Sequence, residues 1–382
     1  MMPNWTLPRR RLLALAGAGA VTAALPGMAF AWTGAAASGP RRLVFIIQRG
    51  AADGLALVPP VGDPAYASLR GALASEAAPG PKLNGLFSLH SALGGVAAML
   101  AAGEARIVHA VATGYRDRSH FDGQNILESG GLTPYGRRDG WLNRMLGLLP
   151  AADSRAVGIA AAVPLALRGA QAAANYAPSR LPGIDEDLMM RLSMLYGADA
   201  QLGPIWQQAV DTKEMAGDIG GNNGRNGTQL GALAARLMTG ADGARVMMIE
   251  TGGWDTHSAQ ARRLEVQARG LDALLVALKA GLGADWASTL VIVATEFGRT
   301  AAVNGTGGTD HGTASALFLL GGTLAGGGTV RADWPGLSPA ALHEGRDLRA
   351  TASLEGEVSA AIAAHYGLEP ALVRRTLYPD LV

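Results

Sequence analysis

Short apolar runs, each followed by a glycine-rich turn, recur along this chain and constrain its fold more than any other feature. The clearest runs are residues 42–47, 106–111, 245–250, 289–294 and 316–320. Each is rich in branched side chains, which is typical of a strand that is buried on both faces. Strands of this kind occur mostly in parallel sheets that are covered by helices.

Helical patterns lie between the predicted strands. Residues 92–102 form a helix-like stretch before the second strand, and residues 355–366 form another near the C-terminus. Between the third and fourth strands, one apolar stripe at helical spacing comprises Ala261, Leu264, Ala268, Leu271, Leu275 and Leu278. The alternation predicts an α/β fold with a mostly parallel central sheet flanked by helices.

The segment of about 133–240 breaks this alternation. It holds apolar stretches at 141–149 and 157–167, a helix-like stretch at 185–196 and a polar loop at 217–227. We predict that it is a largely helical insertion or cap within a domain that spans residues 32–382.

The N-terminal residues predict export. Arg9 and Arg10 lead into an apolar run that ends at Ala29-Phe30-Ala31, with small residues at the two positions that a signal peptidase reads. A transmembrane anchor needs about 20 strongly apolar residues, whereas this run is rich in glycine and alanine and contains Pro26. We therefore expect residues 1–31 to be a cleaved twin-arginine (Tat) signal peptide. The Tat translocon would be the export partner, and the mature protein would be periplasmic or secreted, without a stable membrane span.

Composition narrows the partners and the chemistry. Removal of residues 1–31 changes the formal net charge from +1 to −2 and leaves no run of lysine or arginine, so we expect no nucleic-acid partner. The chain has no cysteine. Disulfides, thiolate nucleophiles and cysteine-ligated zinc or iron–sulfur centres are thereby excluded. Any metal ion must bind to histidine, carboxylate or backbone oxygen atoms.

Polar side chains gather just beyond the predicted strands, where the working residues of open α/β sheets lie. These residues are Asp53, Ser119-His120-Phe121-Asp122, Asp255 with His257, Glu296 with Arg299, and Asp310-His311. Three of the chain's seven histidines thus lie close to an acid in a loop of this kind. Histidine together with carboxylate is the donor set of a divalent-metal site.

Each of these residues also has a purely structural explanation. Asp53 could shape a turn, Ser119 could cap the following helix, and Glu296 with Arg299 could form a buried ion pair. His109 lies within a predicted strand, and we expect it to be a hydrogen-bonded core residue. The metal site is the better explanation for the rest, because several loops at one edge of the sheet would otherwise each need a separate structural reason.

Together these motifs resemble the DUF1501 family, whose members are Tat-exported proteins related to the alkaline phosphatase and sulfatase superfamily. The resemblance rests on Arg49-Gly50-Ala51-Ala52-Asp53-Gly54, Ser119-His120-Phe121-Asp122, Gly253-Trp254-Asp255-Thr256-His257, Thr295-Glu296-Phe297-Gly298-Arg299-Thr300, Gly308-Thr309-Asp310-His311-Gly312 and residues 345–351. It covers nearly all of the chain after residue 31 and is weakest in the segment 133–240.

The resemblance implies an alkaline phosphatase-like fold and a metal-assisted attack on a phosphate or sulfate ester. By position, one or two divalent ions (Zn²⁺, Mn²⁺ or Ca²⁺) would be held by Asp53, Asp255, His257, Glu296, Asp310 and His311. Ser119 would be the nucleophile, unless His120 is the working residue. The ester oxygens would be clamped by the guanidinium groups of Arg49, Arg118 and Arg299.

The sequence departs from the superfamily pattern in two places. Glu296-Phe297 stands where many relatives place Asp-His, which leaves the number of metal ions at one or two. A formylglycine sulfatase is not expected, because the chain has neither a cysteine nor a Ser-x-Pro-x-Arg motif.

We therefore predict an exported metal-dependent hydrolase of phosphate or sulfate esters, acting on a small-molecule or envelope-glycan anionic substrate. One alternative is a non-catalytic binding or assembly protein that retains a metal site. Another is a hydrolase or transferase that acts on a different anionic group.

Overall fold

The computed structural model describes residues 40–76, 80–177, 192, 194–196, 199–207, 209, 226–322, 324 and 326–381. They all belong to one compact unit of the chain. The predicted signal peptide, residues 1–31, lies outside the described residues, as do most of 185–196 and 217–227. Among the helices that are described, none is long and apolar enough to cross a bilayer.

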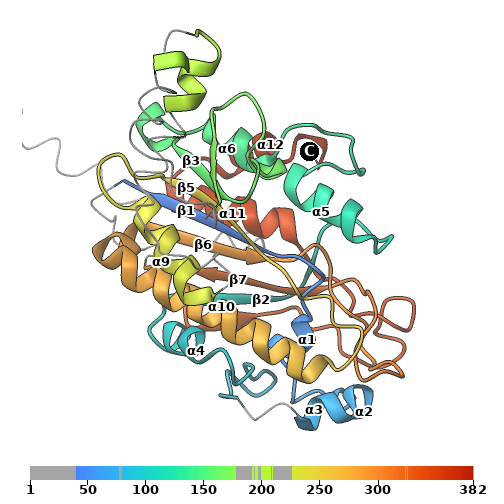
Figure 1. The fold of residues 1–382 in the computed structure, drawn as a ribbon. Coiled ribbons are helices and arrows are strands. Elements are labelled where there is room, and N and C mark those ends of the chain that lie inside the picture. Colours follow the sequence, from blue (N-terminus) through green and yellow to red (C-terminus); the bar gives the residue numbers. More distant parts are fainter. Residues whose placement is uncertain are drawn as a thin grey trace, which may run out of the picture. The chain divides into compact units, whose positions relative to one another are not determined.

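The described residues contain nine strands, which form one sheet in the order β4-β3-β5-β1-β6-β7-β2-β8, with β9 beside β2 (Figure 1). The strands are β1 (Arg42–Gln48), β2 (Ala105–Ala112), β3 (Ala156–Ile159), β4 (Ala174–Tyr176), β5 (Val246–Thr251), β6 (Thr289–Ala294), β7 (Ser315–Leu320), β8 (Thr329–Arg331) and β9 (Ala352–Ser353). All five predicted strands are present. β1, β6 and β7 consist of buried residues only, as their unbroken apolar runs predict.

One strand in the middle of the sheet runs in the opposite direction. β1 pairs in parallel with β5 and β6, whereas β7 is antiparallel to both β6 and β2. The predicted mostly parallel sheet is thus confirmed, with one reversed strand. Because β7 is reversed, the loop before it lies at the same edge as the loops that follow β1, β5 and β6.

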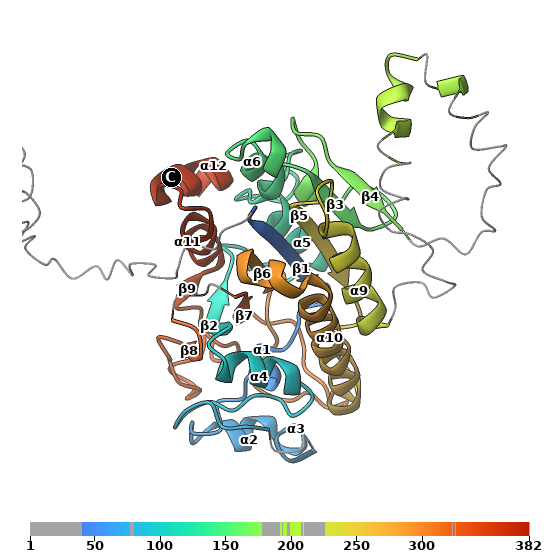
Figure 2. The ribbon, with the colours of Figure 1, turned by 90° about the vertical axis from the view of Figure 1, so that its left-hand side faces the viewer.

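Helices cover both faces of the sheet (Figure 2). One face carries α4 (Gly94–Ala101), α9 (Gly227–Met238) and α10 (Gln260–Leu282), and the other carries α6 (Trp141–Leu146), α11 (Leu354–Tyr366) and α12 (Pro370–Leu377). The remaining helices are α1 (Gly54–Leu57), α2 (Tyr66–Arg70), α3 (Ala72–Glu76), α5 (His120–Ser129) and the 3₁₀ turns Ala151–Asp153, Leu165–Leu167, Gly283–Ser288 and Pro379–Leu381. This layered arrangement is the predicted α/β architecture.

Helix α10 connects β5 to β6 and turns its predicted stripe toward the core. Leu264, Ala268, Leu271, Leu275 and Leu278 are each at most 2% exposed. The helix packs along α9 over much of its length. The apolar face of α10 therefore packs against the sheet and α9. The first turn of α10 lies beside the edge of the sheet that carries the predicted site.

Part of the segment 133–240 belongs to the sheet, which corrects the expectation of a largely helical insertion. β3 pairs in parallel with β5, and β4 pairs in parallel with β3, so the segment extends the sheet beyond β5. These strands are only four and three residues long. Apolar runs this short do not distinguish a strand from a piece of helix by their periodicity.

Candidate metal centre

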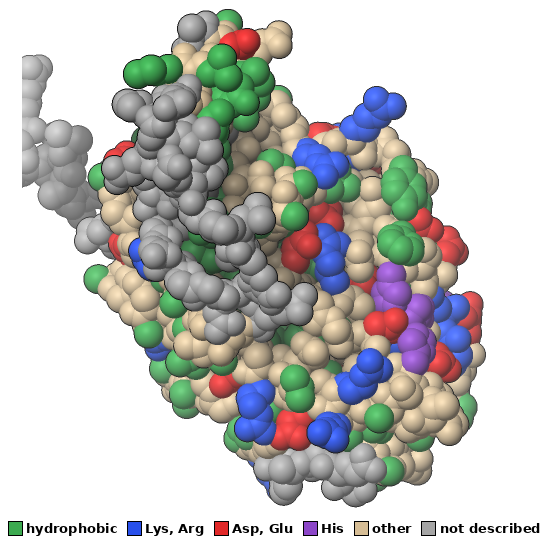
Figure 3. Space-filling view, in the orientation of Figure 1, with side chains coloured by type: hydrophobic (Ala, Val, Ile, Leu, Met, Phe, Trp, Pro, Cys, Tyr) green, Lys and Arg blue, Asp and Glu red, His purple; other side chains and the backbone are tan. Residues whose placement is uncertain are grey.

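Three histidines and one aspartate meet at the carboxyl edge of the sheet. His120 begins α5, Asp255 and His257 lie in the loop after β5, and His311 lies in the loop before β7. The Nε2 atoms of His120, His257 and His311 lie 3.4, 3.0 and 3.4 Å from Oδ1 of Asp255. Figure 3 shows histidine side chains gathered at one place on the surface, with acidic and basic side chains beside them. We call these four residues the His/Asp cluster.

Each imidazole of the cluster is oriented by an acceptor at its other ring nitrogen. The Nδ1 atoms lie 2.8 Å from Glu296 Oε1 for His120, 3.2 Å from Asp310 Oδ1 for His257, and 2.8 Å from the carbonyl oxygen of Arg118 for His311. An ionised carboxylate or a carbonyl only accepts hydrogen bonds, so Nδ1 carries the hydrogen in all three rings. In its neutral form each ring therefore directs the lone pair of Nε2 toward the point where the rings meet Asp255, and a cation bound there could accept it.

The donor set fits a divalent metal ion. Histidines that bind metals usually donate their other N–H to a carboxylate or a carbonyl, as all three do here. In a tetrahedral site with bonds of about 2.0–2.1 Å the ligand atoms lie roughly 3.3 Å apart. The three Nε2 atoms lie 3.0–3.4 Å from Oδ1 of Asp255, Nε2 of His257 lies 3.0 Å from Nε2 of His311, and the ligand atoms of His120, Asp255 and His311 all lie within 4.8 Å of one another. Nε2 of His120 is buried and has no hydrogen-bond partner among the described residues. Imidazole ligands favour a transition metal such as Zn²⁺ over Ca²⁺.

The surroundings of the cluster favour the ionised form of Asp255 and shift the pKa values of His311 and His120 in opposite directions. Burial raises the pKa of Asp255, but Arg299 and the neighbouring imidazoles outweigh this and hold that pKa below its usual value. Burial lowers the pKa of His311. Burial also acts to lower the pKa of His120, yet the hydrogen bond and charge of Glu296 outweigh it, so the pKa of His120 is raised.

Two predicted ligands, Glu296 and Asp310, lie behind the imidazoles that they orient. Glu296 is 1% exposed and accepts hydrogen bonds from the backbone N–H of Gly50 at 2.8 Å and the side chain of Gln124 at 3.0 Å. Burial alone would raise the pKa of Glu296, but the hydrogen bond from His120 and these donors hold it below its usual value. Both acids thus support the cluster from its outer side.

A short antiparallel ribbon brings His311 to the cluster. The N–H of Gly312 donates to the carbonyl of Gly298 at 2.8 Å, and Arg299 and His311 form a bridge between the two segments. A Cβ atom on Gly298 would lie 1.8 Å from the carbonyl oxygen of Ala314, and one on Gly312 would lie 2.3 Å from the backbone of Arg299. Only glycine allows this approach, which explains the glycines in both motifs.

Arg299 lies beneath the cluster and does not face solvent. It is 1% exposed, pairs with Asp255, and donates to the carbonyl oxygens of Gly50 at 2.8 Å, Ala51 at 2.9 Å and Thr309 at 3.1 Å. Each of its three guanidinium nitrogens thus has a protein acceptor. The predicted role as an oxyanion clamp is therefore replaced by a structural one, in which Arg299 anchors Asp255 and the surrounding loops.

The carboxylate of Asp53 bonds to residues outside the cluster. It is fully buried, pairs with the buried Arg70, and accepts from the side chain of Gln260 at 2.5 Å and the N–H of Leu55 at 3.0 Å. The last contact makes Asp53 the N-cap of α1. Both of its carboxylate oxygens are thus engaged, so we leave Asp53 out of the proposed ligand set.

The other two predicted anion-binding arginines are paired with acids. Arg49 contacts Glu128 at 2.6 Å and Glu250 at 2.7 Å. Arg118 contacts Glu344 at 2.7 Å and the buried Asp347 at 2.9 Å. In this arrangement both guanidinium groups are paired with protein carboxylates and neither is positioned to bind an ester oxygen. Arg118 contacts the cluster through its backbone carbonyl, which accepts a hydrogen bond from His311.

The comparison with known families agrees with the motifs. The family described as "Protein of unknown function (DUF1501)" matches residues 97–355. The chain belongs to this family.

The DUF1501 chain has distant likenesses among solved structures. Alkaline phosphatase from the Antarctic bacterium TAB5 is 12% identical, with 74% of this chain and 92% of that chain covered and a TM-score of 0.36. The C-terminal periplasmic domain of EcEptC from Escherichia coli, in complex with Zn, is 7% identical, with 75% and 74% covered and a TM-score of 0.37. No curated protein sequence matches the chain significantly.

Ser119 of this DUF1501 protein stands at the N-cap position of α5, directly before His120. Its side chain makes no capping hydrogen bond to the helix. Its backbone N–H donates to the phenol oxygen of Tyr115 at 3.1 Å. The Ser119 hydroxyl is therefore not hydrogen-bonded to the first turn of the helix, and its geometry does not support the capping explanation for this serine.

Three supporting residues of the DUF1501 site were missed by sequence reasoning. They are Gln124, which donates to Glu296; Asn304, which donates to Asp310 at 3.1 Å; and the fully buried Asp347, which accepts from Thr313 at 2.9 Å and pairs with Arg118. Gln124 follows His120 by one helical turn, and Asp347 lies in the motif of residues 345–351, so both had a sequence signal. Asn304 had none, because an asparagine in a glycine-rich loop is ordinarily a turn residue.

Proposed function

We propose that this protein is an exported metal-dependent hydrolase of phosphate or sulfate esters, with a single divalent ion held by the His/Asp cluster. The observation that carries the proposal is the convergence of three imidazole Nε2 atoms on Asp255, each ring backed by an acceptor at Nδ1. A merely structural cluster has no need of three rings that all face their lone pairs inward.

The chain's own residues would divide the work as follows. Asp255, His120, His257 and His311 would hold the ion, while Glu296, Asp310 and the Arg118 carbonyl keep the rings in place. A bound divalent ion would polarise the ester and lower the pKa of a nearby hydroxyl or water. Ser119 is our choice of nucleophile, because it adjoins His120 and begins a helix whose N-terminus favours the anion that develops during attack.

The first test is metal content and turnover of the purified full-length protein. We expect close to one equivalent of zinc or manganese, with hydrolysis of aryl phosphate or aryl sulfate. His257→Ala together with His311→Ala should remove the metal, whereas His343→Ala, a histidine outside the cluster, should retain it. A folded double variant with full metal content would refute the ligand assignment.

The second test addresses Ser119. Ser119→Ala should keep the metal and the melting temperature but lose turnover by orders of magnitude. Ser119→Thr, which keeps a hydroxyl, should retain part of the activity. Unchanged turnover in Ser119→Ala would show that this serine is not the nucleophile.

One observation favours the alternative of a non-catalytic metal-binding protein. Arg49, Arg118 and Arg299 are all engaged with protein carboxylates or carbonyls, so none of the three is poised to grip an ester. A protein that is fully loaded with metal yet inert toward a broad panel of phosphate and sulfate esters would establish this alternative.

A further inference from the structure

A cavity of about 600 Å³ lies at the carboxyl ends of β3, β4 and β5, the edge of the sheet that also carries the His/Asp cluster. Trp254 lines it and is the chain neighbour of Asp255. The loop from Thr251 to Trp254 thus forms part of the cavity wall and then leads directly into the cluster. A volume of this size accommodates a small organic molecule.

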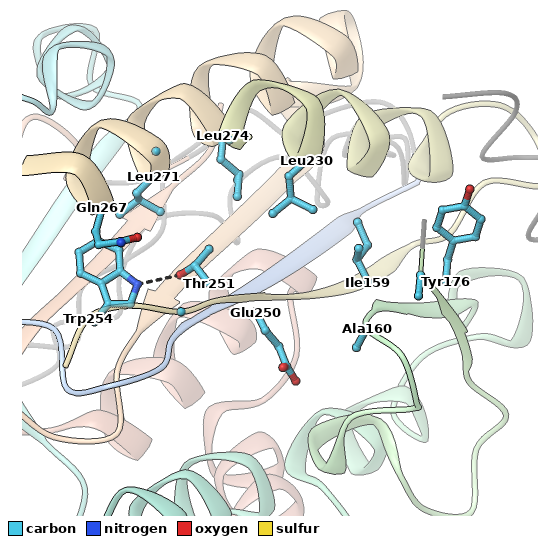
Figure 4. Close-up of a pocket in the computed structure, with 14 residues that line it drawn as sticks. Ile159, Ala160, Tyr176, Leu230, Glu250, Thr251, Trp254, Gln267, Leu271 and Leu274 are labelled. Atoms are coloured by element: carbon cyan, nitrogen blue, oxygen red, sulfur yellow. Dashed lines mark hydrogen bonds between the residues drawn. The ribbon is translucent and has the colours of Figure 1, made fainter. Parts of the chain in front are cut away.

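Most of the cavity wall is apolar. Figure 4 shows Leu230, Leu271 and Leu274 reaching in from helices α9 and α10, with Ile159 and Tyr176 at one end and Trp254 and Gln267 at the other. Thr251 and Gln267 supply polar side-chain atoms, and Trp254 Nε1 donates to Thr251 Oγ1 at 3.0 Å. Such a wall suits a ring or alkyl body with one or two hydrogen-bonding groups.

The charge of the cavity restricts what enters it. Among the fourteen described residues that line it, Glu250 is the only one with a carboxylate, and none is a lysine, arginine or histidine. The cation nearest to Glu250 in the described structure is Arg49, which Glu250 shares with Glu128. In Figure 4 the side chain of Glu250 points away from Leu230, Leu271 and Leu274. A second anionic group on a substrate would therefore meet an apolar wall without a positive partner.

We infer that this cavity binds the alcohol portion of the ester, and that the substrates are monoesters of uncharged, largely apolar alcohols. The inference rests on the proposed hydrolase function and narrows it. We do not expect nucleotides or polyanionic glycans as substrates, because their additional charges would have to enter a cavity whose described lining contains no cation.

Gly270 of α10 offers a clean way to fill the cavity. It lines the wall, and a Cβ atom added there would meet nothing within 4 Å. A larger residue would therefore project into the empty space without a clash, and in a helix interior it should raise the melting temperature slightly. Gly94, at the first position of α4, also has open space around an added Cβ but lies outside the cavity, so Gly94→Leu is the matched control.

The first experiment measures binding of 2-naphthol to the full-length protein by fluorescence, with and without Zn²⁺. We expect binding in both conditions, weakened at least tenfold by Gly270→Leu, less by Gly270→Ala, and within twofold of wild type in Gly94→Leu. The anion 2-naphthoate should bind at least tenfold more weakly than 2-naphthol, because the described lining offers its carboxylate no cation. Equal binding of both probes, or Gly270→Leu binding 2-naphthol like the wild type, would overturn the inference.

The second experiment compares hydrolysis of 2-naphthyl phosphate with that of methyl phosphate. The wild type should prefer the naphthyl ester, and Gly270→Leu should reduce this preference at least tenfold through KM. If the protein hydrolyses methyl phosphate but neither binds 2-naphthol nor prefers the naphthyl ester, the role of the cavity is refuted and the proposed hydrolase function still stands. If the protein binds 2-naphthol in the expected manner but hydrolyses no ester, only the proposed hydrolase function is refuted.

Discussion

Nδ1 of His120 donates a hydrogen bond to Oε1 of Glu296 over 2.8 Å, which joins the first residue of α5 to the loop after β6. The same carboxylate accepts from the backbone N–H of Gly50 after β1 and from Gln124, one turn further along α5. A single buried acid thus holds three segments of the chain in place behind the His/Asp cluster. Its importance lies in orientation, since its oxygens face away from the point where the imidazoles meet.

Glu296→Gln should therefore weaken metal binding without abolishing it. The amide keeps a similar shape but removes the charge that raises the pKa of His120. We expect a loss of about 10–100-fold in metal affinity, the usual effect of removing a partner of a metal-bound histidine. Competition against a chelator of known affinity measures it. Asp310→Asn is the comparison: its side chain is 57% exposed, so the loss should be smaller. Wild-type affinity in Glu296→Gln would disprove the orienting role.

Asp53→Ala should destabilise the fold and leave the metal in place. The substitution leaves the guanidinium of Arg70 buried without its partner, and breaking a buried ion pair costs about 3–5 kcal/mol. Urea unfolding measures the free energy, and metal analysis of the folded fraction measures the stoichiometry. Loss of the metal from protein that is still folded would restore Asp53 to the ligand set.

Acidification should destabilise the protein through His109, which is fully buried within β2 as expected of a core histidine. Its Nδ1 accepts from the N–H of Ala110 at 2.7 Å, while Nε2 donates to the carbonyls of Gly54 and Val58. Burial lowers the pKa of His109 from 6.5 to about 4. The unfolded chain therefore takes up the proton first, and stability falls as the pH drops from 6.5 to 4.

The full effect of His109 is roughly 3 kcal/mol, from about 1.4 kcal/mol for each unit by which the two pKa values differ. Urea unfolding at several pH values between 4 and 7 measures it. In His109→Gln, which lacks the titrating ring, the dependence on pH should be flatter than in the wild type. Equal slopes in the two proteins would contradict the prediction.

Export should depend on the arginine pair and end with cleavage after Ala31. The paired arginines and the Ala-Phe-Ala triplet motivate this expectation. Mass spectrometry of the exported protein should find Trp32 at the N-terminus. Arg9→Lys with Arg10→Lys should leave the precursor in the cytoplasm, whereas the same change at Arg11 should have a smaller effect. Normal export of the double variant would point to the general secretory route.

The sequence by itself determined the strands of the sheet's centre and the loops in which the site would be found. Apolar runs such as residues 42–47 and 289–294 leave a chain few choices other than buried strands, and the carboxyl ends of parallel strands meet at one edge. His120, Asp255, His257 and His311 were placed at that edge for this reason, and there they meet. The stripe of α10 was equally clear, because six apolar residues at helical spacing have one consistent explanation.

Only the tertiary structure decided which acids face the imidazoles and which stand behind them. Asp53 and Glu296 lie in similar glycine-containing loops, but their partners differ. Asp53 pairs with Arg70 of α2, whereas Glu296 accepts a hydrogen bond from His120 of α5, which is 176 residues away in the chain. The reversed direction of β7 was decided in the same way, since an apolar run has the same pattern in both directions. The role of a side chain depends on the residues that it contacts in the folded protein. When such a contact joins residues that are distant in sequence, the local sequence around either residue does not predict it.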